Sequence, residues 1–330
     1  MQYTDFDAII QNARFFKTIL GKTKLCAVLK NNAYGHGIVR TASALQGIAD
    51  FFAVGSVQEA LQVKDFCPNV LILLPVHSQE EIALALKHGF IFTLDSFFTL
   101  FALQDAVQNR KARVHVKVET GMNRLGFDVE QLPALLQQLN CQKVAVEGAF
   151  SHFFGESETQ CDGQMEKFQK AINLLSLRFP SLVCHIANTS ATLLKEKYRL
   201  DMCRVGLGLY GYGAPNLAVA KTVTAKVIAM RSVRAGESVG YGAKYVFPFD
   251  TTVAIVGCGY ANGFARALKN AKVKIGKQLF PVVGNVCMAM FAVDVKNSNV
   301  QVGDDVILLG NGVNNANCDV IVYELLCNLR

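Results

Sequence analysis

The chain has 330 residues, enough for one large domain and a smaller one, because single cores stop growing at roughly 250–300 residues. Its formal net charge is +7, but the basic residues form neither a tail nor a patch interleaved with aromatic side chains. The charge therefore favours small anions over nucleic acid as ligands. Apolar runs such as 70–75 are strand-length, far below the ~20 residues of a membrane helix, so we expect no membrane association.

The amino-terminal segment MQYTDFDAIIQN is acidic and amphipathic, which argues against a signal or transit peptide and favours a cytoplasmic protein. The ten cysteines include no CxxC pair, and those in apolar segments read as buried hydrophobes: Cys26, Cys184, Cys203 and Cys258. The six histidines are dispersed, without an HExxH motif or a His/Cys cluster. We therefore expect no metal site.

The first predicted element is an amphipathic helix over residues 4–20. Apolar residues recur there at helical spacing, Thr4 could cap the helix, and Gly21 could end it.

Eight short apolar or alternating segments follow, with helix-length stretches between them. They span 24–30, 50–55, 69–75, 91–95, 112–119, 144–150, 182–187 and 202–210. Capping-box signatures, Ser56 with Glu59 and Ser78 with Glu81, follow two of these segments directly. Eight alternating strand and helix units favour a TIM-like (β/α)8 barrel over an open doubly wound sheet. Neither GxGxxG nor GxxxxGK[ST] occurs, which argues against a dinucleotide or P-loop domain.

The pattern changes near residues 214–216. Alternating strands separated by glycine turns are predicted over 222–230, 251–257, 273–275, 279–283, 291–295 and 305–309, and residues 318–329 look helical or frayed. The predicted fold class is therefore α/β, with an amino-terminal (β/α)8 barrel over residues 1–217 and a mainly-β domain over residues 218–330.

A single lysine, Lys30, ends the apolar run LCAVLK and is followed at once by the turn NNAYGHG. An isolated lysine at a strand end most often reaches into solvent. A desolvated amine at the mouth of a barrel could instead form a Schiff base.

Residues at the carboxyl ends of barrel strands face the active site. This rule selects Lys30, Lys117, His152, Asn188 and Arg204. His152 alone could be a hydrogen-bonded core histidine. Arg204 has apolar neighbours that indicate burial, and a buried guanidinium needs partners.

A small-residue segment, Gly206 to Gly208, follows Arg204. Its backbone amides could cradle a phosphate at the last barrel loop. Together with the strand-end lysine, this segment indicates a phosphorylated aldehyde cofactor.

The run 25–37 resembles the cofactor-lysine segment of the alanine racemases. Other segments resemble motifs of the same family in the same order, namely VHVKVETGMNRLGF, GAFSHF, HIANTSATL, RVGLGLYG, VGYGAKY, GCGYANGFAR and VVGNVCMAMFAVDV. Together they span nearly the whole chain.

The resemblance implies a racemase that interconverts L-alanine and D-alanine and supplies D-alanine for peptidoglycan. Lys30 would hold pyridoxal 5'-phosphate as an aldimine and act as one base, and Tyr241 from the second subunit of a homodimer would be the other. Two bases on opposite faces of the substrate are what racemisation requires. His152 would tune Tyr241, and Arg204 would face the pyridine nitrogen, where a cation disfavours protonation.

The resemblance also implies the remaining contacts. Tyr34, Asn188, Thr189, Gly206 and Leu207 would bind the cofactor, mostly at its phosphate. Arg124 would contact the phenolic oxygen of the cofactor and the substrate carboxylate, and Lys117, carbamylated in many relatives, would hold Arg124. In the β domain, Met288 would offer its amide to the substrate carboxylate, while Tyr260 and Arg266 would line the entrance channel.

Several positions depart from the family's pattern. Thr189 stands where serine is usual and keeps the hydroxyl. Asn262, Asn285 and Ala289 replace an aspartate, an arginine and an aspartate, so we expect part of the polar network at the entrance to be missing. The sequence stops at Arg330, where longer relatives continue to a tyrosine that Tyr323 does not match. We therefore expect a more open entrance and a weaker grip on the phosphate.

Other functions compete with this one. A racemase of another small amino acid such as serine would use the same residues. A non-catalytic protein of pyridoxal-phosphate homeostasis could share the barrel, although it would need neither a second base nor a carboxylate site. A decarboxylase on a related barrel would fit the lysine but lacks the VGYG context.

Overall fold

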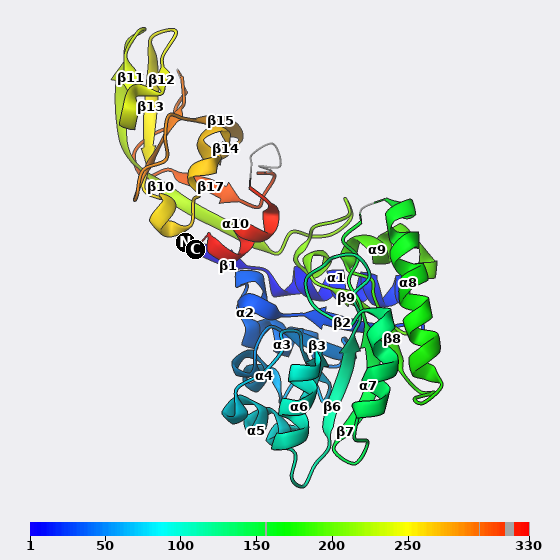
Figure 1. Ribbon diagram of the computed structural model, residues 1–330. Helices are drawn as coiled ribbons and strands as arrows, with labels where there is room; N and C mark the ends of the chain where they lie inside the picture. Colours follow the sequence, from blue (N-terminus) through cyan, green and yellow to red (C-terminus); the bar gives the residue numbers. More distant parts are fainter. Residues whose placement is uncertain (156, 297, 314–319, 330) are drawn as a thin grey trace. The chain divides into compact units, whose positions relative to one another are not determined.

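The computed structural model describes residues 1–155, 157–296, 298–313 and 320–329, which form two compact units (Figure 1). The barrel unit comprises Phe6–Ala33 and Gly37–Ala218, and the β unit comprises Met1–Asp5, Tyr34–His36 and Val219–Arg330. The domain bounds 1–217 and 218–330 stay a prediction. None of the helices in the described ranges has the length and apolar character that a membrane crossing requires.

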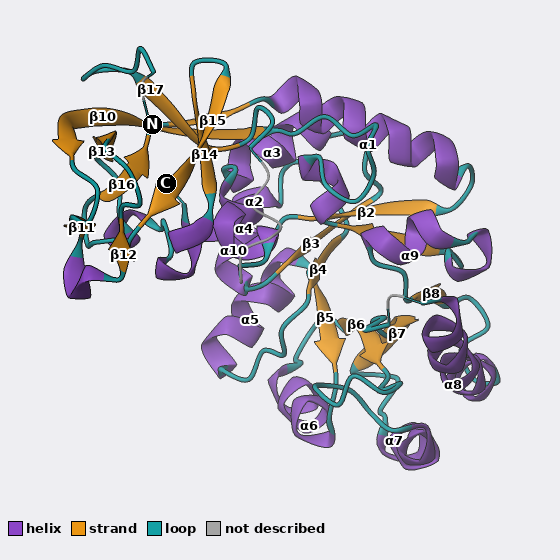
Figure 2. Ribbon diagram, turned by 90° about the horizontal axis from the view of Figure 1, so that it is seen from above, coloured by secondary structure: helices purple, strands orange, loops and turns teal. Residues whose placement is uncertain are grey.

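Eight parallel strands form the wall of the barrel unit, and helices surround them in Figure 2. The strands pair in the order β8-β7-β6-β5-β4-β3-β2-β9. They are β2 (Lys24–Val28), β3 (Phe51–Val54), β4 (Val70–Ile72), β5 (Ile91–Leu94), β6 (Ala112–Lys117), β7 (Val144–Phe150), β8 (Val183–His185) and β9 (Met202–Val205). Two backbone hydrogen bonds join the edges, from Asp201 N to Cys184 O (3.1 Å) and from Arg204 N to Ala187 O (3.0 Å). The predicted (β/α)8 barrel is confirmed.

The helices of this region cover the barrel or connect its strands. They are α1 (Phe6–Leu20), α2 (Lys30–Gly35), α3 (Ile38–Leu45), α4 (Val57–Val63), α5 (Gln79–His88), α6 (Phe97–Ala106), α7 (Leu132–Gln138), α8 (Glu158–Ser176) and α9 (Thr189–Leu194), with 3-10 turns η1 (Val129–Gln131), η2 (Glu196–Tyr198) and η3 (Leu207–Tyr210). The first helix was predicted to begin at Thr4, but it begins at Phe6, because Gln2–Thr4 form a strand of the β unit.

The predicted capping box at Ser56 is only half formed. Ser56 Oγ accepts from Glu59 N at 3.2 Å. The Glu59 carboxylate turns elsewhere and accepts from Gly55 N (2.8 Å) and Asn32 N (2.9 Å). It therefore ties α4 to the turn that follows Lys30. Ser78 likewise accepts from Glu81 N, at 3.4 Å.

The β unit is built around one long strand, β10 (Lys221–Val233). It pairs with β13 (Thr251–Val256), with β17 (Asp305–Leu309) and with β1 (Gln2–Thr4). The ladder β13-β16-β15-β14-β17 returns to β10, so these antiparallel strands close a second barrel. The remaining elements are β16 (Phe291–Asp294), β15 (Gln278–Val283), β14 (Lys272–Ile275), the hairpin β11 (Ser238–Val239) and β12 (Tyr245–Val246), and α10 (Val322–Asn328), with η4 (Tyr241–Ala243), η5 (Tyr260–Asn262) and η6 (Arg266–Asn270).

The six strands predicted for the second domain are all present, so its mainly-β character is confirmed. The sequence missed β1 and the short hairpin. Of the segment 318–329, predicted to be helical or frayed, residues 318 and 319 lie outside the described residues, and 322–328 are helical.

The interior of the (β/α)8 barrel holds a histidine whose space depends on a glycine. A Cβ atom on Gly148 of β7 would lie 2.8 Å from His115 Cδ2 and 2.7 Å from Val183 O. His115 is fully buried and comes from the neighbouring strand β6. Its ring can occupy the interior only because position 148 has no side chain.

We predict that Gly148→Ala lowers the free energy of unfolding by about 1–3 kcal/mol, because overpacking forces a side chain or the backbone to move. Gly163→Ala in α8 is the matched control, since a Cβ there meets open space. The control should gain up to about 1 kcal/mol from helix propensity. Denaturant unfolding of both variants measures the difference, and equal stabilities would contradict the packing argument.

Candidate active site

Arg204 on β9 is a buried cation held by neutral groups. One guanidinium nitrogen, Nη1, donates to His185 Nδ1 at 2.8 Å, and Nη2 donates to Ser151 O (2.7 Å) and His152 Nδ1 (3.0 Å). Longer bonds reach two further carbonyls. Burial lowers the pKa of Arg204 to about 10. Within the described residues, none of its hydrogen-bond partners is a carboxylate, so its charge is not neutralised.

The histidines beside Arg204 have fixed tautomers, because a guanidinium only donates. His185 Nδ1 must accept, so His185 carries its proton on Nε2 and donates to His115 Nδ1 at 2.8 Å. His115 then carries its proton on Nε2, a buried atom with no hydrogen-bond partner in the described part of the chain. The result is a one-directional chain from Arg204 through His185 to His115.

All three imidazoles of the cluster are held in the neutral form. Burial, followed by the charge of Arg204, places the pKa values of His152 and His185 well below the ordinary value of 6.5. Burial and then the charge of Arg113 lower the pKa of His115 to about 3. Neutral acceptors can hold Arg204 in place without cancelling its charge.

The ring of Phe150 at the end of β7 lies close to two basic side chains. Lys117 Nζ is 4.8 Å from the ring centroid, and Arg204 Cζ is 5.3 Å from it. The His185 ring stacks on the same ring at 5.0 Å. The face of an aromatic ring attracts cations, so Phe150 stabilises both charges.

Lys117 ends β6 with only 8% of its surface exposed. Burial, followed by the charges of Arg204 and Arg124, lowers its pKa from 10.5 to about 7. A substantial fraction of the amine is therefore unprotonated near neutral pH. An unprotonated lysine amine is a nucleophile, which a surface lysine is not at this pH.

Arg124 lies on the exposed loop that follows β6. The loop ends are tied by the Val118–Phe127 bridge. The Glu119 carboxylate accepts from the amides of Gly121 and Arg124, the latter at 3.3 Å. Burial acts to raise the pKa of Glu119, but these amide donors hold it below its usual range. The loop thus places Arg124 within the electrostatic reach of His152 and Lys117.

The turn after Lys30 is left-handed. Asn31, Asn32, Ala33 and Tyr34 have φ between 52° and 54°. Such residues cost roughly 1–2 kcal/mol each outside glycine, so the surroundings must hold them. Asn32 N donates to Glu59, and Asn32 Oδ1 accepts from Ile38 N at 2.8 Å.

Lys30 itself is partly buried at the start of this turn. Its charge acts on His152, together with those of Arg204, Lys117 and Arg124. Lys30 therefore belongs to the same cluster of groups beyond the carboxyl ends of the strands.

The last barrel loop brings backbone amides to a hydroxyl. Thr189 Oγ1 accepts from Gly206 N (3.3 Å) and Gly208 N (3.2 Å). A Cβ atom on Gly208 would lie 2.5 Å from Phe16 Cζ and 2.9 Å from Thr189 Cγ2. Asn188 caps α9 by accepting from Ala191 N at 3.0 Å. The amides and the hydroxyl form a cradle of a kind that binds phosphate, with Leu207 between the two glycines.

Tyr34 is packed in the β unit. Its side chain is 6% exposed, and its ring centroid lies 5.7 Å from that of Tyr323 on α10. Burial, and then the proximity of Tyr323, raises the pKa of Tyr34.

The other predicted residues of the β unit lie at its surface. Tyr241, Met288 and Tyr260 are 76%, 61% and 44% exposed, and Arg266 at the start of η6 is also exposed. Tyr260 N donates to Cys287 O at 3.1 Å, so the Tyr260 turn lies against the Met288 segment. Each of these side chains can reach another molecule.

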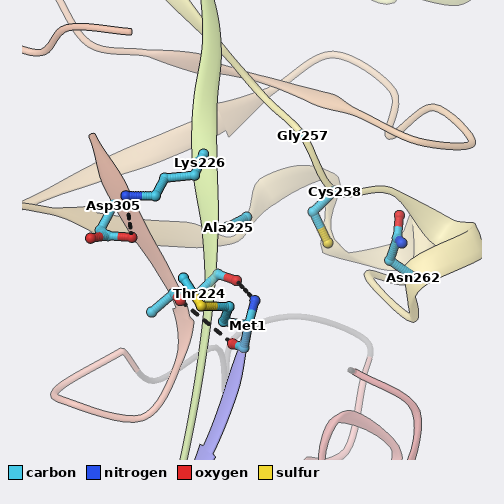
Figure 3. A pocket seen from close by; sticks show the side chains of 8 residues that line it. All are labelled: Met1, Thr224, Ala225, Lys226, Gly257, Cys258, Asn262 and Asp305. Carbon is cyan, nitrogen blue, oxygen red and sulfur yellow. Dashed lines mark hydrogen bonds and ion pairs between the residues drawn. The ribbon is translucent and has the colours of Figure 1, made fainter. Parts of the chain in front are cut away.

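A cavity of about 270 Å³ in the β unit holds none of the predicted site residues (Figure 3). Its polar groups bind one another, with the Met1 ammonium 2.6 Å from Thr224 O and Lys226 3.0 Å from Asp305. The groups at the mouth of the (β/α)8 barrel are better candidates for chemistry.

The sequence did not single out His115, His185, Phe150 or Glu119. The strand period of two was an available signal, because His115 precedes Lys117 by two residues and Phe150 precedes His152 by two. Nothing in the spacing indicated that Glu119 would bind the amides of its own loop.

Lys117 provides a pH-dependent test of the cluster. Between about pH 7 and pH 10.5 the unfolded chain binds the lysine proton and the folded chain does not, so stability contributed at this position rises with pH across that window. We predict that Lys117→Met stabilises the cofactor-free protein by roughly 2–5 kcal/mol at about pH 6 and that the gain shrinks toward pH 10. Denaturant unfolding in CO2-free buffer measures it, with Lys87→Met on the exposed end of α5 as the control. A gain that stays constant with pH would contradict the lowered pKa.

Two family models together match nearly the whole chain. One, described as "Alanine racemase, N-terminal domain", matches residues 4–214, and the other, "Alanine racemase, C-terminal domain", matches residues 220–330. Among similar proteins, alanine racemase 1 of Caldanaerobacter subterraneus subsp. tengcongensis is 34% identical and covers 92% of this chain and 84% of its own length. The alanine racemase of Synechocystis sp. is 34% identical, with 99% of this chain and 95% of the relative covered.

Solved structures of similar sequence share the fold. The biosynthetic alanine racemase from Pseudomonas aeruginosa has a TM-score of 0.92 at 30% identity, covering 100% of this chain and 96% of that chain. The alanine racemase from Bartonella henselae, with covalently bound pyridoxal phosphate, has a TM-score of 0.88 at 29% identity, with coverages of 100% and 96%. The chain therefore belongs to the alanine racemase family.

Proposed function

We propose that this protein interconverts L-alanine and D-alanine with pyridoxal 5'-phosphate and so supplies D-alanine for peptidoglycan in the cytoplasm. The observation that carries the proposal is the buried Arg204, which is bonded only to carbonyls and imidazoles in the described residues and lies in one cluster with Lys30. A cation that lacks a carboxylate partner suits a site where a ring nitrogen has to stay unprotonated.

The residues of the barrel mouth fit the cofactor. Lys30 would hold it covalently, and Arg124 would contact its phenolic oxygen. The Thr189 hydroxyl and the amides of Gly206 and Leu207 would receive the phosphate, with Asn188 shaping the loop and Tyr34 as a further phosphate ligand. The convergence of the Gly206 and Gly208 amides on the Thr189 hydroxyl supports this assignment.

Pyridoxal phosphate, when bound, draws electrons from the α-carbon of an amino acid and so acidifies the α-proton. Arg204 would lie against the pyridine nitrogen and disfavour its protonation, because two positive charges in contact repel. The neutral histidines His185 and His115 keep Arg204 oriented without supplying a proton. This arrangement favours the return of a proton to the α-carbon over other reactions.

Two proton carriers would act on opposite faces of the substrate. Lys30 Nζ is one, and Tyr241 Oη from the second subunit of a homodimer is the other. The 76% exposure of Tyr241 supports a role toward another molecule. His152, bonded to Arg204, would tune the tyrosine, which must work far below its ordinary pKa of about 10.

The remaining residues would bind the substrate and line its path. Met288 would offer its backbone amide to the carboxylate, and Tyr260 and Arg266 would line the entrance. Lys117 is a candidate for carbamylation, since its amine is partly unprotonated near pH 7 and a carbamate would convert a like-charge contact with Arg124 into an attractive one.

The direct test is α-proton exchange. We predict that each enantiomer of alanine gains α-deuterium and racemises in deuterium oxide. Tyr241→Phe should reduce exchange from one enantiomer by about 10²- to 10⁴-fold and leave exchange from the other, because only one face loses its base. Optical rotation and proton NMR measure both quantities.

Tyr3→Phe, which removes a hydroxyl from an exposed tyrosine of the same unit, is the control and should leave both rates unchanged. Faster exchange with serine than with alanine would assign another small amino acid as substrate. No exchange with any amino acid, despite bound cofactor, would instead indicate a protein of pyridoxal-phosphate homeostasis and overturn the racemase assignment.

A further inference from the structure

We propose that Asn285 is a positioning residue for Tyr241, which it holds through the backbone of the turn that presents this side chain. The inference rests on the proposed function, because it concerns Tyr241 as one of the two bases. It assigns a role to a position where this sequence departs from its family's pattern.

The turn that carries Tyr241 has little support of its own. It connects β11 and β12, two strands of two residues each, paired only as Ser238↔Val246 and Val239↔Tyr245. Gly240 and Gly242 have φ of 74°, and Ala243 has φ of 48°. An isolated two-stranded hairpin is marginal in water, so other segments must fix this one.

The strand pair next to the turn is fixed by apolar packing. Val239 and Tyr245 pack against a buried cluster that consists of Val233, Phe247, Val253, Val283 and Ala292. The Tyr245 and Phe247 rings meet edge to face at 5.0 Å. This packing stops short of the turn itself.

The segment 284–285 packs directly against strand β11 of the hairpin, at Val239. A Cβ atom on Gly284 would lie 2.9 Å from Val239 O and 3.0 Å from Val239 Cγ1, and Gly284 also has a φ of 71°. Position 284 is therefore restricted to glycine by space and by conformation. The close approach brings the next residue, Asn285, beneath the turn.

Asn285 reaches the turn with its side chain. Its Nδ2 atom donates to the Tyr241 carbonyl at 2.9 Å. The absence of the arginine that is usual at this position predicts an incomplete polar network at the entrance, and the Asn285 amide supplies one hydrogen bond to the turn.

This bond matters because of the exposure of Tyr241. In the single chain the Tyr241 side chain is 76% exposed and has few packing contacts to orient it before it meets another molecule, so its direction depends on its backbone. The bonded carbonyl belongs to Tyr241 itself.

The test compares Asn285→Ala and Asn285→Asp, both of which remove the donor. We expect exchange to slow about two- to tenfold for only the enantiomer that Tyr241→Phe affects, as the loss of one net hydrogen bond predicts. In a Tyr241→Phe background, Asn285→Ala should have no further effect. In the cofactor-free protein, hydrogen–deuterium exchange of the amides in 239–246 should become faster in both variants.

Asn270→Asp on the exposed η6 is the control for the added charge and should match the parent. Equal slowing of both enantiomers, an additive effect in the double variant, or unchanged amide exchange would overturn the positioning role. If the parent itself exchanged no amino acid, the proposed function would fail first, and the amide exchange would still report whether Asn285 holds the turn.

Discussion

The structure of the site depends on one buried cation. Arg204 is 4% exposed and donates hydrogen bonds to backbone carbonyls and to the Nδ1 atoms of His152 and His185. A buried guanidinium without a carboxylate is costly unless its donors are satisfied and a ligand makes use of the charge. Here neutral groups satisfy the donors, so the charge stays available toward the barrel mouth. Burial lowers the pKa values of His152, His185 and His115, and the charge of Arg204 lowers them further, so all three imidazoles are neutral.

The fold supplies the conditions for this arrangement. The closing contacts of the barrel place Arg204 N on Ala187 O, so the last strand presents its arginine beside β8 and its histidine. Gly148 leaves the space that His115 fills, and Phe150 shares its ring between Lys117 and Arg204. Nearer the amino terminus, the Glu59 carboxylate accepts from Asn32 N and so holds the left-handed turn that directly follows Lys30. Packing, hydrogen bonding and charge therefore all serve the same few groups.

Local sequence patterns predict the strands and the residues at their ends, but they do not predict the contacts that hold the Lys30 turn. The eight barrel strands, the β strands of the second unit and the strand-end residues follow from periodicity and from the rule that barrel sites lie at carboxyl ends. The spacing predicts that Glu59 is a capping partner, since sequence spacing cannot show that Asn32 N, distant along the chain, competes for the same carboxylate. The left-handed run begins at Asn31 and Asn32, whose residue type tolerates positive φ, but it continues through Ala33 and Tyr34, for which propensity gives no sign. Long-range contacts decided each of these cases.

We propose that the charge of Arg204 determines which reaction the cofactor carries out. The most direct measurement is the ratio of racemisation to transamination in Arg204→Glu and Arg204→Lys, with pyridoxamine phosphate formation followed by absorbance in the holoenzymes. Arg204→Glu should slow racemisation by about 10²-fold or more and raise transamination, since an electrostatic group at the reacting centre is lost, while Arg204→Lys should keep transamination low. An Arg204→Glu enzyme that racemised alanine at the parent rate without added transamination would contradict the claim.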